Sequence, residues 1–178
     1  MVSAIVGGMK FIYNDGGRKA ASFQGSTGDC VVRAVAIATE QSYQTVYDAL
    51  SDGTRGQRHS KRHPRGQRTV RNGVDTRSKW FKDYMLTLDW KWTATMRIGS
   101  GCKVHLTDGE LPSGRLIVAV SRHYTTVIDS VIHDTHDPQR EPQDVYSGEI
   151  TIDADGTKRN RVIGTIGGRC VYGYWSKA

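Results

Sequence analysis

The chain has 178 residues, a formal net charge of +7 and a hydrophobic content of 37%. This length fits a single domain with its own core, and no stretch approaches the apolar run of about 18 residues needed to span a bilayer. The three cysteines, at positions 30, 102 and 170, match neither a disulfide framework nor a zinc-binding spacing. Residues 1–8 lack the basic segment of a signal peptide. We therefore expect no membrane association and a reducing, cytoplasmic setting.

Hydrophobic periodicity and capping residues predict one strand and three helices in the first half of the chain. In chain order these are a strand at residues 10–13, a helix at 30–39, a helix capped by Ser42 and ended by Asp52-Gly53, and a helix at 77–88 capped by Asp75 or Thr76.

The segment between the second and third helices is strongly basic. Residues 55–82 contain ten Lys or Arg residues and one acidic residue, Asp75, and residues 54–73 show no periodicity. One interpretation is a solvated loop, and another is a surface for an acidic protein or nucleic acid. Aromatic residues are absent from residues 55–79, which argues against stacking on nucleic-acid bases.

The first candidate functional residue is Cys30, which follows the polar, glycine-rich segment 23–29 and starts the first predicted helix. Backbone N–H groups at a helix N-terminus are unpaired, and the helix dipole is positive there, so both favour a thiolate over a thiol. Gln24 lies six residues upstream of Cys30 and can direct its side-chain amide at an oxyanion beside the sulfur. The segment is typical of a nucleophile with its oxyanion site.

The second half is predicted to be mainly β structure. The expected elements, in chain order, are an extended stretch at residues 90–92, strands at 102–106 and from 115 onward, a hairpin turning at Asp129-Ser130, a polar excursion at 139–148 beside the proposed site, a hairpin turning at 154–157, and a last strand at 169–175 in which Cys170 is packed.

The hairpin at Asp129-Ser130 carries the other candidate functional residues. If these two residues form the turn, the numbers of paired residues sum to 259, and His123 lies opposite His136. Asp134 then lies diagonally beside His123 on the same face, within reach of its imidazole. A carboxylate in that position fixes the tautomer of a base and stabilises its imidazolium form.

Together these stretches resemble the papain-like cysteine peptidase superfamily. Gln24-Gly25-Ser26-Thr27-Gly28-Asp29-Cys30 is similar to the family segment Gln-Gly-x-Cys-Gly-Ser-Cys, with Thr27 in place of the first cysteine, and His123 and Asp134-Thr135-His136 follow in the family's order. The resemblance implies Cys30 as nucleophile, His123 as base, Asp134 as orienting residue and Gln24 in the oxyanion hole. In the bacteriocin-processing branch the orienting Asp precedes a proline, which makes Asp137 the competing candidate.

The resemblance implies an α+β protein with a papain-like fold, in which N-terminal helices that start at the catalytic cysteine pack on a C-terminal antiparallel sheet. We expect one domain over residues 1–178, with a mainly helical half at 23–90, a basic loop at 54–73 and a mainly β half at 91–178.

The expected activity is hydrolysis of peptide, isopeptide or other amide bonds of a protein substrate through a thioester. Deamidase and acyltransferase chemistry would use the same residues, and none of these roles requires a metal or cofactor. Small glycine-rich proteins of this pattern look like those of bacteriophages, which would make the substrate a host or phage protein. The alternative is a non-catalytic binding protein that uses residues 55–82 to hold nucleic acid or an acidic protein.

Overall fold

The computed structural model describes residues 8–25, 27–56, 69–140, 143–152, 154–166 and 168–178. In chain order its elements are β1 (Lys10–Tyr13), α1 (Cys30–Thr39), α2 (Tyr43–Arg55), the 3₁₀ turn η1 (Val70–Asn72), α3 (Lys79–Thr87), β2 (Trp90–Ala94), β3 (Arg115–Val120), β4 (His123–Ile128), β5 (Val131–Asp134), β6 (Gln143–Ile152), β7 (Lys158–Ile166) and β8 (Val171–Lys177). The structure confirms an α+β protein, and most of the predicted basic loop, residues 57–68, lies outside the described residues.

Six strands form one mixed sheet in the order β1-β5-β4-β3-β8-β2. Neighbouring strands are antiparallel except for β1, which runs parallel to β5 at the edge of the sheet. The expectation of an antiparallel sheet built only from the C-terminal half is therefore wrong at this edge. The N-terminal strand completes the sheet because β5 would otherwise leave its backbone groups unpaired there.

Helix α1 is the centre of the fold. Eight consecutive residues, 31–38, are buried, so the helix is covered on all sides, as expected for a helix that is apolar all round except for one arginine, Arg33. Its main partner in the sheet is β4, where the buried Thr126 hydroxyl donates to the Ala34 carbonyl at 2.8 Å. The start of α1, with Cys30, is thereby held beside the sheet.

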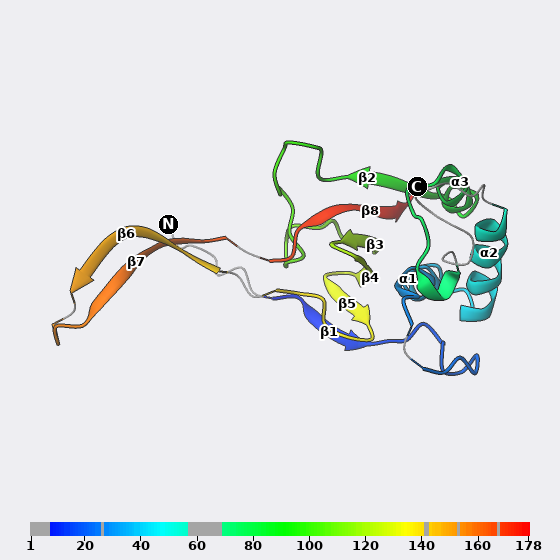
Figure 1. Ribbon diagram of the computed structural model, residues 1–178, viewed down its shortest axis with the longest axis horizontal. Helices are drawn as coiled ribbons and strands as arrows, with labels where there is room; N and C mark the ends of the chain where they lie inside the picture. The colour runs from blue at the N-terminus through cyan, green and yellow to red at the C-terminus, as the bar shows by residue number, and fades with distance from the viewer. Residues whose placement is uncertain (1–7, 26, 57–68, 141–142, 153, 167) are drawn as a thin grey trace.

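Strand β3 is buried on both faces and separates two hydrophobic cores. Ile117 faces the core that it shares with the helices, whereas Leu116 and Val118 face a second core closed by Leu106 and Leu111. Figure 1 shows the three helices gathered on one side of the molecule. Because both faces of β3 are covered, it carries a continuous apolar run rather than an alternating one.

The boundaries of α2 and α3 differ from the predicted ones. Ser42 caps α2 as predicted, but the helix continues through Gly53 to Arg55, and α3 is capped by Ser78 rather than by Asp75 or Thr76. Gly53 lies within the helix, and the Trp80 ring occupies the space that a side chain would fill: a Cβ there would lie 2.3 Å from two ring carbons. The glycine provides room for a tryptophan and does not end the helix.

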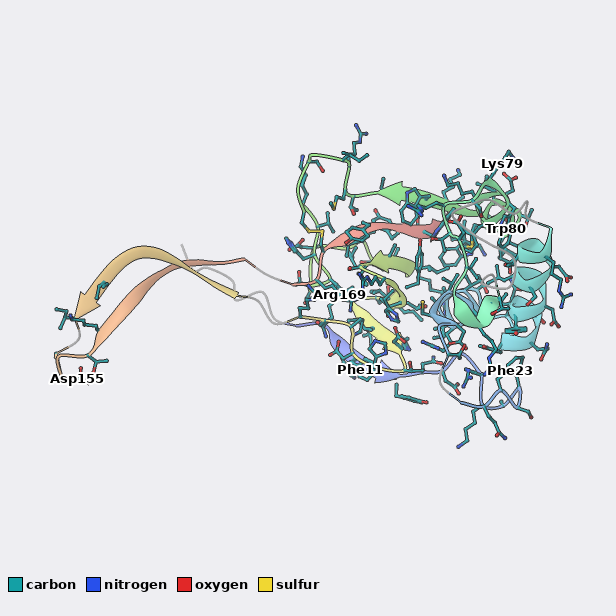
Figure 2. The ribbon with its side chains drawn as sticks, in the orientation of Figure 1. Phe11, Phe23, Lys79, Trp80, Asp155 and Arg169 are labelled. Atoms are coloured by element: carbon teal, nitrogen blue, oxygen red, sulfur yellow. A yellow bond between two sulfur atoms is a disulfide. The ribbon has the colours of Figure 1, made fainter. Side chains whose placement is uncertain are left out.

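Strands β6 and β7 form a separate two-stranded sheet. The predicted turn at 154–157 is confirmed, but the hairpin does not join the main sheet, and the predicted polar excursion at 139–148 is partly β6. Figure 1 shows this hairpin projecting away from the rest of the molecule, and Figure 2 places Asp155 at its tip, on the side opposite Trp80 and the helices.

Cys102 and Cys170 form a disulfide, with their Cα atoms 5.8 Å apart. The prediction of unpaired cysteines is wrong for this pair, and residues 102–106 contribute an isolated bridge between His105 and Cys170 rather than a strand. Sequence spacing could not predict the pairing because 68 residues separate the two cysteines. Cys30 is the free cysteine.

Replacing Gly53 with alanine tests the packing of Trp80. Alanine normally stabilises a helix relative to glycine, but here its methyl group would overlap the Trp80 ring. We expect Gly53→Ala to lower the free energy of unfolding by about 1–3 kcal/mol, measured in urea. Gly56→Ala is the matched control, since a Cβ at Gly56 makes only ordinary contacts. A Gly53→Ala protein as stable as the control would contradict this packing.

Candidate active site

The segment before Cys30 is held in place by backbone and side-chain contacts. The Gly28 N–H and the Thr27 hydroxyl both donate to the Arg71 carbonyl, at 2.7 Å each. Asp29 adopts a non-helical conformation, and the helix begins at the next residue, Cys30, as predicted. The half-buried Cys30 thiol therefore lies at the N-terminus of a fully buried helix, where the helix dipole favours negative charge.

His123 and Asp134 form a short hydrogen bond between neighbouring strands. The predicted register is confirmed: Thr126 pairs with His133, and the turn falls at Asp129-Ser130. His123 Nε2 lies 2.6 Å from Asp134 Oδ2, and the His123 and His136 ring centroids are 4.8 Å apart. With Nε2 directed at the carboxylate, Nδ1 is the ring nitrogen that remains for proton exchange.

The surroundings of His123 favour its protonated form. Burial alone lowers the pKa of His123, but interactions with Asp134 and Cys30 outweigh it and raise the pKa from 6.5 to about 9. Burial raises the pKa of Asp134, but the interaction with His123 and the hydrogen bond from the Thr135 N–H lower this pKa overall. Asp134 and Cys30 together therefore stabilise the protonated form of the His123 imidazole.

Asp137, the competing orienting residue, does not lie at His123. Its carboxylate is exposed and accepts hydrogen bonds from the backbone and side-chain amides of Gln139, at 2.9–3.1 Å. Asp134 is 3% exposed and points at the imidazole. Between the two candidates, the structure brings Asp134 to His123.

Gln24 is the predicted site residue that does not line the cleft of Cys30 and His123. A cleft of about 850 Å³ is lined by Cys30 and His123 and, among the described residues, its lining does not include Gln24. The exposed Gln24 instead lines a neighbouring cavity of about 600 Å³, which shares Thr27, Arg33 and His136 with the cleft. Its predicted oxyanion role therefore has no support from the placement of its side chain.

A buried charge network beneath the site was missed by the sequence reasoning. Asp29 is 1% exposed and accepts hydrogen bonds from Arg18 Nε at 2.9 Å, from the Tyr43 hydroxyl at 2.5 Å and from Arg33 Nη1. Arg33 Nη2 lies 3.8 Å from Asp134 Oδ1. One guanidinium thus joins the residue before the candidate nucleophile to the carboxylate behind the candidate base. An arginine within the apolar run of α1 was the signal available in the sequence.

The same groups offer a possible set of metal ligands. One ligand atom from each of His123, Asp134 and His136 lies within 4.8 Å of the others, and imidazole nitrogens with a carboxylate are donors that zinc accepts. A metal ion would have to take the carboxylate and imidazole that hydrogen-bond to one another. Metal binding and proton exchange between His123 and Cys30 would therefore compete.

A double-mutant cycle tests the network. Arg33→Met leaves the buried Asp29 and Asp134 charges without their shared partner, so we expect a loss of about 3 kcal/mol in the free energy of unfolding. Adding Asp29→Asn should recover part of that loss, because it removes one of the carboxylates left uncompensated. Urea unfolding of the wild type, both single variants and the double variant measures the coupling. Strictly additive effects would contradict a shared network.

Comparisons of the chain with protein-family models, with curated proteins and with solved structures found no match. The geometry of the site therefore carries the functional argument.

Proposed function

We propose that the chain is a cysteine-dependent hydrolase that cleaves peptide, isopeptide or other amide bonds of a protein substrate. The observation that carries the proposal is the arrangement of Cys30, His123 and Asp134. The first two line one cleft, and the third hydrogen-bonds to His123 at 2.6 Å from the buried side. A nucleophile, a base and a group that orients the base are the parts that acyl transfer requires.

In this mechanism His123 takes the proton of Cys30, and the helix N-terminus and the imidazolium stabilise the thiolate. The sulfur attacks the acyl carbon, and the backbone N–H of Cys30 donates to the oxyanion in this proposal. His123 then protonates the leaving nitrogen, and water attacks the thioester with His123 again as base. Attack by an amine instead of water would make the same site a transferase, and a glutamine substrate would make it a deamidase.

The papain-like fold is part of the same proposal. It is supported by the helix that begins at Cys30, by the order of Cys30, His123 and Asp134 along the chain, and by the adjacent antiparallel strands that carry the last two. The oxyanion role of Gln24 depends on the resemblance alone, and it would require the Gln24 side chain to move from the neighbouring cavity.

The location of the activity is also a proposal. We infer a cytoplasmic protein, and a host or phage substrate if the chain is from a bacteriophage. Among the described residues, no helix is long and apolar enough to cross a membrane. The Cys102–Cys170 disulfide argues the other way, because structural disulfides are rare in reducing compartments. A cytoplasmic location would make this disulfide an exception to that pattern.

Alkylation by iodoacetamide across pH, with peptide mapping, tests the activated cysteine. We expect Cys30 to react at pH 6 about 100-fold faster than an ordinary thiol, which has a pKa of about 8.5 and is almost fully protonated at that pH. His123→Ala should remove this advantage. His133→Ala is the matched control, since this imidazole lies on the same strand as Asp134 but does not line the cleft, and its loss should leave the rate unchanged. Cys102 and Cys170 should react only after reduction.

Release of products from a proteome-derived peptide library then tests hydrolysis itself. Cleavage should persist with a chelator present and disappear in Cys30→Ala. An unreactive Cys30, together with binding that falls steeply with salt and survives Cys30→Ala, would instead favour the binding protein that uses residues 55–82.

A further inference from the structure

The cleft that contains Cys30 and His123 has a one-sided charge. Its charged lining residues are arginines, its other titratable lining residues are histidines, tyrosines and Cys30, and within the described part of the chain its lining contains no Asp or Glu. A smaller cavity of about 130 Å³ continues past Arg77, Trp92 and Tyr124 and adds Lys82. A cleft lined by one sign of charge attracts ligands of the opposite sign.

Two of the cleft arginines are available to a ligand. Arg33 is committed to buried Asp29 and Asp134, so its charge is compensated. Within the described residues Arg77 forms one salt bridge, with Asp75 at 3.9 Å, and its side chain is 90% exposed, which makes that pair weak. Arg122 is exposed and forms no salt bridge with any described residue.

The backbone at Arg122 is unusual for an arginine. Arg122 occupies the second position of the two-residue turn between β3 and β4 with φ of +57°, next to His123. Glycine or asparagine fits such a left-handed position without cost, whereas a long side chain there is uncommon. An arginine in this turn carries its charge directly beside the candidate base.

Aromatic rings form other parts of the cleft lining. Trp92 is 38% exposed, Tyr172 is 40% exposed, and Tyr124 is held by a 2.9 Å hydrogen bond from its hydroxyl to Thr76. Large apolar surfaces left partly open to solvent in a cleft are typical of ligand recognition. The lining therefore suits a ligand that combines negative charge with an apolar or aromatic group.

We propose that the cleft binds an acidic peptide segment, in which Arg77 and Arg122 receive a Glu or Asp side chain close to the scissile bond and the aromatic rings hold a neighbouring apolar side chain. This proposal rests on the proposed function. A peptide is favoured over a polynucleotide because the cleft contains the Cys30–His123 pair, which acts on an acyl carbon that a polynucleotide backbone does not contain.

Two isosteric reagents test the charge preference: N-iodoacetyl-Glu-Phe-amide and N-iodoacetyl-Gln-Phe-amide. In each, the Cys30 thiolate forms a C–S bond to the methylene carbon, and iodide leaves. At pH 9 and low ionic strength the full-length protein should react with the Glu reagent about three- to tenfold faster than with the Gln reagent. The ratio should fall toward one in Arg77→Gln and Arg122→Gln and remain high in Arg55→Gln, a matched charge change outside the cleft.

A ratio near one in the wild type, or a high ratio that neither arginine substitution changes, would overturn the acidic-peptide assignment. The assignment would also be overturned if an oligonucleotide protects Cys30 from alkylation at concentrations where a Glu-rich peptide gives no protection. At pH 9 even an ordinary thiol is largely ionised, so the ratio reports on the cleft whether or not Cys30 is activated. Failure of the proposed function would appear separately, as an ordinary pH dependence of alkylation.

Discussion

The burial of α1 is the constraint on which the rest of the structure depends. Residues 31–38 are all buried, so the helix lies between the sheet on one side and the other helices on the remaining sides. The hydrogen bond from Thr126 to the Ala34 carbonyl sets its position along β4. The helix then begins beside the end of the sheet where β4 starts, and this brings Cys30 to His123.

The charge interactions at the N-terminus of α1 follow from the same burial. Asp29 and Asp134 have almost no contact with solvent, and each carboxylate needs cationic or hydrogen-bonding partners to remain charged. Arg33 serves both, and His123 serves Asp134. Because folding raises the pKa of His123 to about 9, the stabilisation from its protonated form is complete below about pH 6.5 and disappears as the pH rises through 9.

Local patterns in the sequence were sufficient to predict the helix and the strands that carry the candidate site. The glycine-rich turn followed by an apolar run placed the start of α1 at Cys30, and the Asp129-Ser130 turn set the register that places His123 beside Asp134. Features that depend on distant contacts were not predicted. The Cys102–Cys170 disulfide and the Trp80 ring over Gly53 each join segments far apart in the chain. The placement of Gln24 depends on side-chain geometry that sequence order does not encode.

Cys30 and Asp134 together raise the pKa of the His123 imidazole, and NMR titration of the His123 ring measures that effect. We expect a His123 pKa raised from 6.5 to about 9 in the wild type, lower values in Cys30→Ala and in Asp134→Asn, and little change in Asp137→Asn. A His123 ring that titrates near 6.5 and is insensitive to Cys30→Ala would contradict the coupling of Cys30 to His123.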